Sequence, residues 1–140
     1  MTEFTTQVAT AKSRMAQILD ATPFQKNVYL SQKHEANIFL KREDLTPVRS
    51  YKLRGAYNFI SKALDNDENH KGEFVCASAG NHAQGFAFSC AHFGVTGTIF
   101  MPVTTPQQKI DKTRAFGGKN VEIKLIGDIF DQCYAAALAF

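Results

Sequence analysis

Two short segments of the sequence carry residue types that could act in chemistry. The first runs from Arg49 to Gly55, and Lys52 stands there at the start of an expected helix. The positive end of the helix dipole disfavours a protonated amine at this position, and Arg54 adds a fixed positive charge nearby. Only a neutral amine attacks an aldehyde, so Lys52 is a candidate Schiff-base nucleophile. The alternative is an ordinary solvated lysine at a helix start.

The second segment lies between an expected strand and an expected helix, and it reads Ser78-Ala79-Gly80-Asn81-His82-Ala83-Gln84-Gly85. Small residues let the backbone approach a ligand closely, and the N–H groups of a helix start favour an anion such as a carboxylate or phosphate. Asn81 offers both a donor and an acceptor. We expect His82 to shape the loop rather than to act as a general base. The alternative is that Ser78 or Asn81 only caps the helix.

Other reactive patterns are absent from the sequence. Neither GxGxxG nor GxxxxGK[ST] occurs, which argues against a dinucleotide or Walker-type phosphate site, and no GxSxG is present. The four histidines and three cysteines show no metal-ligand spacing, so no bound metal is expected. Widely spaced cysteines in an odd number favour reduced thiols, as in a cytoplasm.

The composition is typical of a soluble domain. The 140 residues are 44% hydrophobic and 21% charged, with a net charge of +3. Basic residues are interleaved with acidic ones, so no nucleic-acid partner is expected. No apolar stretch approaches the roughly 20 residues of a membrane span, and no signal peptide is recognisable. These features predict a cytoplasmic protein that does not bind a membrane.

Predicted helices and strands alternate along the chain. The apolar spacing predicts helices over 7–19, 50–64, 81–93, 105–116 and from 128 onward, and strands over 36–41, 73–77, 98–101 and 121–126. The polar run 65–69 ends the second helix, while Gly94 and the pair Gly117-Gly118 are stop signals. This order predicts an α/β fold with an open, mainly parallel sheet and helices on both faces.

Taken together, the two reactive segments resemble a known family. The sequences that carry the resemblance are Leu40-Lys41-Arg42-Glu43-Asp44-Leu45, Ser50-Tyr51-Lys52-Leu53-Arg54-Gly55-Ala56-Tyr57 and the run from Ser78 to Gly85. They are similar to the serine/threonine dehydratases, which are fold type II pyridoxal phosphate (PLP) enzymes. The lead-in Pro47-Val48-Arg49 resembles the biosynthetic threonine dehydratases (threonine ammonia-lyases) in particular.

The resemblance implies a role for each matching residue. Lys52 would bind pyridoxal 5'-phosphate as a Schiff base, and Tyr51 would pack beside the cofactor, where phenylalanine is usual in the family. Asn81 would hydrogen-bond the hydroxyl group of the cofactor ring. The loop that would hold the substrate carboxylate comprises Ser78, Ala79, Gly80, Asn81 and His82.

The resemblance also implies a reaction and a domain arrangement. The reaction is the deamination of L-threonine, and of serine as a second substrate, by a lyase of isoleucine and branched-chain amino-acid biosynthesis; threonine yields 2-oxobutyrate and ammonia. Residues 1–45 would supply a helix and strand of the large PLP domain, and residues 46–140 the small domain, truncated at its C-terminal end. The family's glycine-rich phosphate loop lies outside this sequence, and the last helix reaches Phe140 without a cap. We therefore expect an N-terminal fragment that is inactive alone and belongs to a homo-oligomer when full length.

Two alternatives remain at this stage. The chain could be a non-enzymatic α/β fragment or interaction module. It could also belong to a related PLP enzyme that acts on serine, either a dehydratase or a racemase. Threonine synthase is disfavoured, because Lys52 is followed by Leu-Arg-Gly rather than by the Asp-Arg-Gly usual in that enzyme.

Overall fold

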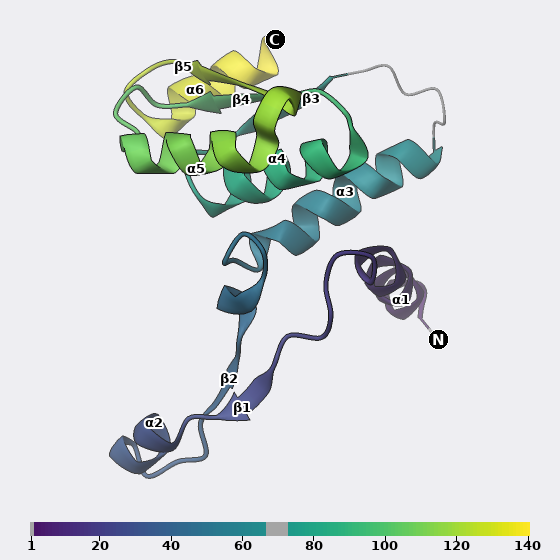
Figure 1. The fold of residues 1–140 in the computed structure, drawn as a ribbon, viewed down its shortest axis with the longest axis vertical. Coiled ribbons are helices and arrows are strands. Elements are labelled where there is room, and N and C mark those ends of the chain that lie inside the picture. Colours follow the sequence, from purple (N-terminus) through teal and green to yellow (C-terminus); the bar gives the residue numbers. More distant parts are fainter. Residues whose placement is uncertain (1, 67–72) are drawn as a thin grey trace. The chain divides into compact units, whose positions relative to one another are not determined.

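A computed structural model of the protein describes residues 2–66 and 73–140 (Figure 1). They divide into two compact units, Met1–Tyr51 and Lys52–Phe140. The boundary implied by the family resemblance, between residues 45 and 46, stays a prediction. The polar run predicted to end the second helix lies, from residue 67 onward, outside the described residues. Among the residues described, no helix combines the length and apolarity needed to cross a membrane.

The first unit consists of short elements. They are α1 (Glu3–Met15), β1 (Phe24–Lys26), α2 (Val28–Lys33), β2 (Phe39–Lys41) and the 3-10 turn η1 (Glu43–Leu45). The two strands pair antiparallel, with Phe24 opposite Lys41 and Lys26 opposite Phe39. The rings of Phe24 and Phe39 stack at 5.2 Å between centroids, so this ladder is held on one side by an aromatic pair.

The first helix begins and ends four residues earlier than the sequence predicted. Thr2 caps it by accepting a hydrogen bond from the Thr5 N–H, and Glu3 adds a negative charge to its first turn. Its residues are all partly or fully exposed, so the apolar spacing that suggested residues 7–19 did not reflect burial against this unit. The short elements β1 and α2 were not predicted.

The second unit is a three-layer α/β structure. Its elements are α3 (Lys52–Asn66), β3 (Phe74–Ala77), α4 (Asn81–Phe93), β4 (Gly97–Met101), α5 (Gln107–Gly117), η2 (Gly118–Asn120), β5 (Val121–Leu125) and α6 (Phe130–Leu138). The strands lie in the order β3-β4-β5 and both pairs are parallel. Gly94, at φ 67°, ends α4 in the left-handed conformation that glycine adopts without steric cost, as its stop signal predicted.

Helices cover both faces of this sheet, as predicted. All five residues of β4 are buried, which requires cover on each side. Ile99 and Met101 point into the core cluster that α4 and α5 help to form. Phe100 points the other way, where its ring lies 5.6 Å from that of Phe140, beyond the end of α6. Figure 1 shows α4 and α5 on one side of the strands and α6 on the other.

Candidate functional site

Lys52 is the first residue of α3, and its side chain is exposed. The next residue, Leu53, is fully buried, and the buried face continues one turn later with Ala56 and Tyr57. This pattern anchors the first turn of α3 through Leu53 and leaves Lys52 on the outer face. The predicted place of Lys52, in the first turn of a helix, is therefore confirmed.

The loop Ser78–Gly80 connects β3 to α4 at the carboxyl end of the strand. The Ser78 N–H donates to the Phe100 carbonyl at 3.0 Å, so the loop leaves the sheet from a fixed point. The Ser78 hydroxyl accepts a hydrogen bond from the Gly80 N–H at 3.3 Å. In open α/β sheets the carboxyl ends of the strands are where ligands bind, so the position of the loop suits a binding site.

No side chain caps the start of α4. Gly80 is the N-cap residue, and Asn81 is already the first residue of the helix. Neither Ser78 nor Asn81 is therefore the N-cap residue of this helix. The first N–H groups of a helix have no partner within the helix, and without a side-chain cap they are available to an anion. Asn81 and His82 are both exposed at this end of the helix.

Gly85 brings the two candidate segments together. A Cβ atom at this position would lie 3.0 Å from the Leu53 Cα, 3.1 Å from the Leu53 nitrogen and 3.2 Å from the Lys52 carbonyl carbon. The first peptide of α3 thus packs directly on α4, one helical turn after Asn81. The sequence had placed Gly85 in the small-residue loop, but its contact with α3 could not be read from the sequence.

The ionisation of His82 reports on the same proximity. Partial burial and the positive charge of Lys52 lower the pKa of His82 below its ordinary value. The imidazole is therefore largely neutral near pH 7, when it can both donate and accept a hydrogen bond. Lys52, His82 and the start of α4 form one electrostatic environment within the second unit.

Tyr51 is the one predicted site residue that falls in the first unit, where it is the last residue and is 58% exposed. The second unit contains both Lys52 and the loop residues, which are Ser78, Ala79, Gly80, Asn81 and His82. The roles implied for all of these residues stay predictions.

A hydrogen-bonded turn that the sequence did not reveal precedes Lys52. The Thr46 hydroxyl accepts a hydrogen bond from the Ser50 N–H at 2.9 Å and donates one to the Ser50 carbonyl at 3.0 Å. Within this turn Arg49 adopts the left-handed conformation, with φ 59°. A hydroxyl residue four positions before Ser50 was the only signal in the sequence, and it is a weak one.

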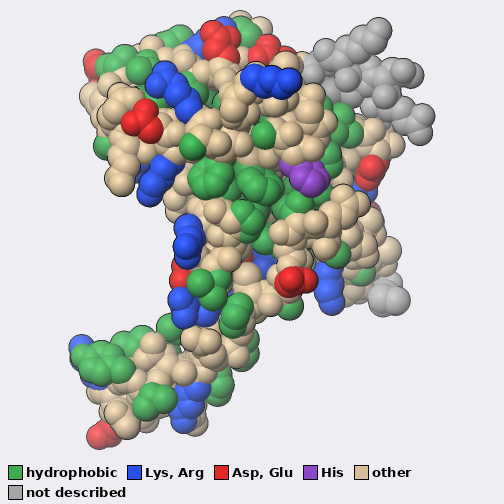
Figure 2. Space-filling view, viewed as in Figure 1, with side chains coloured by type: hydrophobic (Ala, Val, Ile, Leu, Met, Phe, Trp, Pro, Cys, Tyr) green, Lys and Arg blue, Asp and Glu red, His purple; other side chains and the backbone are tan. Residues whose placement is uncertain are grey.

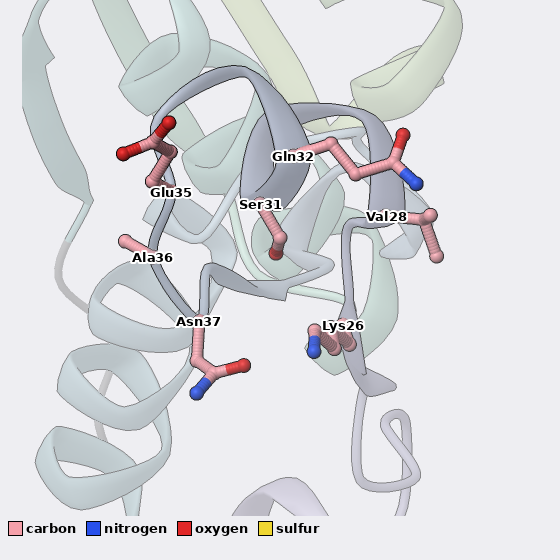
Figure 3. Close-up of a pocket in the computed structure, with 7 residues that line it drawn as sticks. All are labelled: Lys26, Val28, Ser31, Gln32, Glu35, Ala36 and Asn37. Atoms are coloured by element: carbon pink, nitrogen blue, oxygen red, sulfur yellow. The ribbon is translucent and has the colours of Figure 1, made fainter.

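An open cavity of about 400 Å³ lies in the first unit, and none of the predicted site residues lines it. Figure 3 shows its lining, which mixes the polar side chains of Lys26, Gln32, Glu35 and Asn37 with smaller residues of α2 and the loop that follows it. The large cavity and the reactive side chains therefore do not coincide.

Other groups in the described residues do not add a reactive centre. Burial raises the pKa of both Cys76 and Cys90 to about 12, so these thiols are neutral and unreactive. Among residues 2–66 and 73–140 no group of three or more His, Cys, Asp or Glu side chains could hold a metal ion. On the face drawn in Figure 2, acidic and basic side chains of the second unit are interspersed.

The chain is similar to several known proteins. The family model described as "Pyridoxal-phosphate dependent enzyme" matches residues 15–140. The biosynthetic L-threonine dehydratase IlvA of Staphylococcus epidermidis is 54% identical over 136 residues, which are 97% of this chain and 32% of that protein. The enzyme of the same name from Lactococcus lactis subsp. lactis is 52% identical over 134 residues, covering 96% of this chain and 32% of that protein. The chain thus spans about a third of the length of these curated relatives.

Solved structures give the same result for the fold. The processed form of threonine deaminase isoform 2 from Solanum lycopersicum superimposes with a TM-score of 0.80 at 36% identity, covering 98% of this chain and 37% of that one. Maize serine racemase gives a TM-score of 0.83 at 25% identity, covering 96% of this chain and 39% of that one. Both the α/β fold and the family resemblance predicted from the sequence are confirmed.

Proposed function

The chain belongs to the family of pyridoxal-phosphate dependent enzymes, and we propose that it supplies the Schiff-base lysine and the substrate-carboxylate loop of an L-threonine ammonia-lyase. The observation that carries this proposal is the contact of the first peptide of α3 with Gly85. Through that contact the amine-bearing residue Lys52 sits beside an uncapped helix start. A reactive amine next to an anion-binding backbone suits an enzyme that acts on amino acids.

The residues of this chain fit the aldehyde and ring side of the cofactor. Lys52 is exposed and can reach an aldehyde, and the exposed amide of Asn81 can donate a hydrogen bond to a ring hydroxyl. When bound, pyridoxal phosphate supplies the aldehyde and an electron-withdrawing ring that stabilises negative charge at the substrate α-carbon. Tyr51, next to Lys52 in sequence, would pack against the ring.

Backbone and side-chain groups then act on different parts of the substrate. The N–H groups at the start of α4 bind the carboxylate of threonine, helped by Ser78 and the backbone of Ala79 and Gly80. The amine of Lys52 takes the α-proton. His82, whose pKa is lowered by partial burial and by Lys52, adds no positive charge of its own beside Lys52 near pH 7. The β-hydroxyl then leaves threonine as water. Hydrolysis of the dehydrated product consumes one water and yields 2-oxobutyrate and ammonia.

A related reaction on serine is the second candidate. Its support is the TM-score to maize serine racemase, which is as high as that to the tomato threonine deaminase. The greater sequence identity to threonine dehydratases favours the lyase reaction in isoleucine biosynthesis. We further propose that the complete enzyme is cytoplasmic, in line with its buried free cysteines and a biosynthetic role. The family resemblance supports the proposal that it is also a homo-oligomer.

A chimera tests this proposal. The chain replaces the matching third of the S. epidermidis dehydratase, and the purified protein is assayed with L-threonine and L-serine. We expect 2-oxobutyrate from threonine, pyruvate from serine, and a loss of at least about a thousandfold in the Lys52→Ala chimera, since the residue that removes the proton is gone. A folded chimera that binds the cofactor and releases D-serine instead would favour the racemase. Turnover that does not depend on Lys52 would contradict both candidates.

A further inference from the structure

Gly85 differs from the other crowded glycines of this unit in the kind of atoms that a Cβ would meet. At Gly97 a Cβ would meet side-chain atoms, the Cys90 sulfur and the Phe86 ring, both at 2.7 Å. At Gly117 it would meet the Val121 side chain at 2.2 Å. Among the glycines in the described ranges, Gly85 is the one whose crowding neighbours are backbone atoms. Backbone atoms cannot rotate away, so a side chain at Gly85 would have to displace α3 from α4.

The displaced backbone would be that of the residue bearing the amine. The atoms within 3.2 Å of the Cβ position belong to the peptide that joins Lys52 to Leu53. On the α4 side the helix is held by the core around Gly85, because its neighbours Ala83, Phe86 and Ala87 are buried in the core cluster. The start of α3 would therefore give way.

The start of α4 is held close to Lys52 by the same contact. Gly85 lies one turn beyond Asn81, so the backbone that meets Lys52 is continuous with the uncapped first turn. After partial burial, the positive charge of Lys52 is also a cause of the lowered pKa of His82 in that turn. An increase in the spacing of the two helices at Gly85 would move the amine away from the whole loop.

We propose that Gly85 is a positioning residue, which sets the distance between the amine of Lys52 and the first turn of α4 and thereby the reactivity of that amine. The inference rests on the proposed function of Lys52. It adds that the amine is positioned by the lack of a side chain at Gly85, which is 33 residues further along the chain than Lys52. Gly85 itself touches neither substrate nor cofactor in this role.

The test uses the 140-residue chain in a graded series, Gly85→Ala and Gly85→Val. The control is Gly97→Ala, which crowds side chains in the same unit without touching the backbone of Lys52. The first readout is the NMR titration midpoint of the His82 imidazole, which needs no cofactor, and Lys52→Gln serves as a reference without the amine charge. The second is the rate at which excess pyridoxal phosphate, trapped with borohydride, labels Lys52 as followed by mass spectrometry.

In both Gly85 variants we expect the titration midpoint of His82 to rise toward its ordinary value, as it should in Lys52→Gln. The rise should be larger for Gly85→Val than for Gly85→Ala. We expect labelling of Lys52 to fall several-fold for Ala and about tenfold or more for Val, because small misplacements of a reacting group are costly. Gly97→Ala should leave both readouts at their wild-type values.

Folded Gly85 variants in which neither the His82 midpoint nor the labelling of Lys52 changes would overturn the inference. Equal changes of both readouts in Gly97→Ala would overturn it as well, because Gly85 would then be an ordinary packing residue. A failure of the proposed function would give a different experimental result. In that case wild-type Lys52 is not labelled in preference to other lysines, and the His82 titration alone decides whether Gly85 sets the helix spacing.

Discussion

Two segments lead into helices that begin with a candidate site residue, and they are held in different ways. Before Lys52, the turn from Thr46 to Ser50 is closed by the buried Thr46 hydroxyl, which accepts a hydrogen bond from the Ser50 N–H and donates one to the Ser50 carbonyl. Before Asn81, the loop from Ser78 to Gly80 ends without any side-chain cap on the helix. The first segment thus pairs polar groups within the turn, whereas the second leaves backbone N–H groups at the helix start that could bind an anion.

This difference matches the chemistry proposed for each segment. A lysine that forms a covalent bond needs a backbone that does not move, since its long side chain already contributes several freely rotating bonds. A loop that binds a carboxylate needs donors that are not used internally. In the proposed function the first segment would be a rigid attachment point and the second an open anion site, and the substitutions below test that difference.

The largest effect on stability is expected from Thr46→Val. It removes both hydrogen bonds to Ser50, whose N–H and carbonyl groups are then left without this partner in a buried position. The free energy of unfolding, measured by urea denaturation, should fall by about 1–3 kcal/mol. The control is Thr10→Val, which removes an exposed hydroxyl hydrogen bond on α1 and should change stability by less than about 0.5 kcal/mol. Equal effects of the two variants would mean that the turn before Lys52 is not specially held.

A smaller effect of the opposite sign is expected from Arg49→Gly. Arg49 has φ 59°, a conformation that costs a residue with a side chain about 1 kcal/mol more than glycine. The gain in the native state is partly offset by the greater freedom of glycine in the unfolded chain, so we expect a rise of up to about 1 kcal/mol in the free energy of unfolding. Arg49→Val should destabilise instead, because a β-branched residue tolerates this conformation poorly. Thermal unfolding of both variants checks the sign, and a stabilising Arg49→Val would show that the turn is not strained.

The smallest effect on stability, but an informative one, is expected at the start of α4. Gly80→Asn adds a side-chain cap, and Gly80→Asp adds the same cap with a negative charge; a Cβ at this position would meet open space. Each should stabilise the chain by a few tenths of a kcal/mol. In the chimera, the KM for threonine should rise more for Asp than for Asn, because the added carboxylate repels that of the substrate. Identical KM values would argue that the carboxylate binds elsewhere.

The two units also differ in how far the sequence predicted them. In the second unit, long elements with buried faces and clear stop signals were predicted to within about two residues, as for α4 with its end at Gly94. In the first unit, α1 has no buried residue and was misplaced, and β1 and α2 were missed. These short elements bury too little to leave a periodic pattern, since β1 is exposed along its length.

The candidate site shows the same division. Lys52 and the Ser78 to Gly85 loop were recognisable, because residue type and position before a helix carry their chemistry. The contact between Gly85 and the Lys52–Leu53 peptide was not, because it joins segments about thirty residues apart through the absence of a side chain. Small residues in a loop were interpreted as space for a ligand, whereas Gly85 makes space for another helix.

The central claim is that Lys52 is the residue that bonds to the cofactor. The direct test is to incubate the purified chimera with pyridoxal phosphate, reduce it with borohydride and locate the phosphopyridoxyl group by peptide mass spectrometry. We expect one label per chain, on Lys52, and its loss in Lys52→Ala without labelling of another lysine. Label spread over exposed lysines such as Lys26 and Lys112, with no enrichment at Lys52, would contradict it.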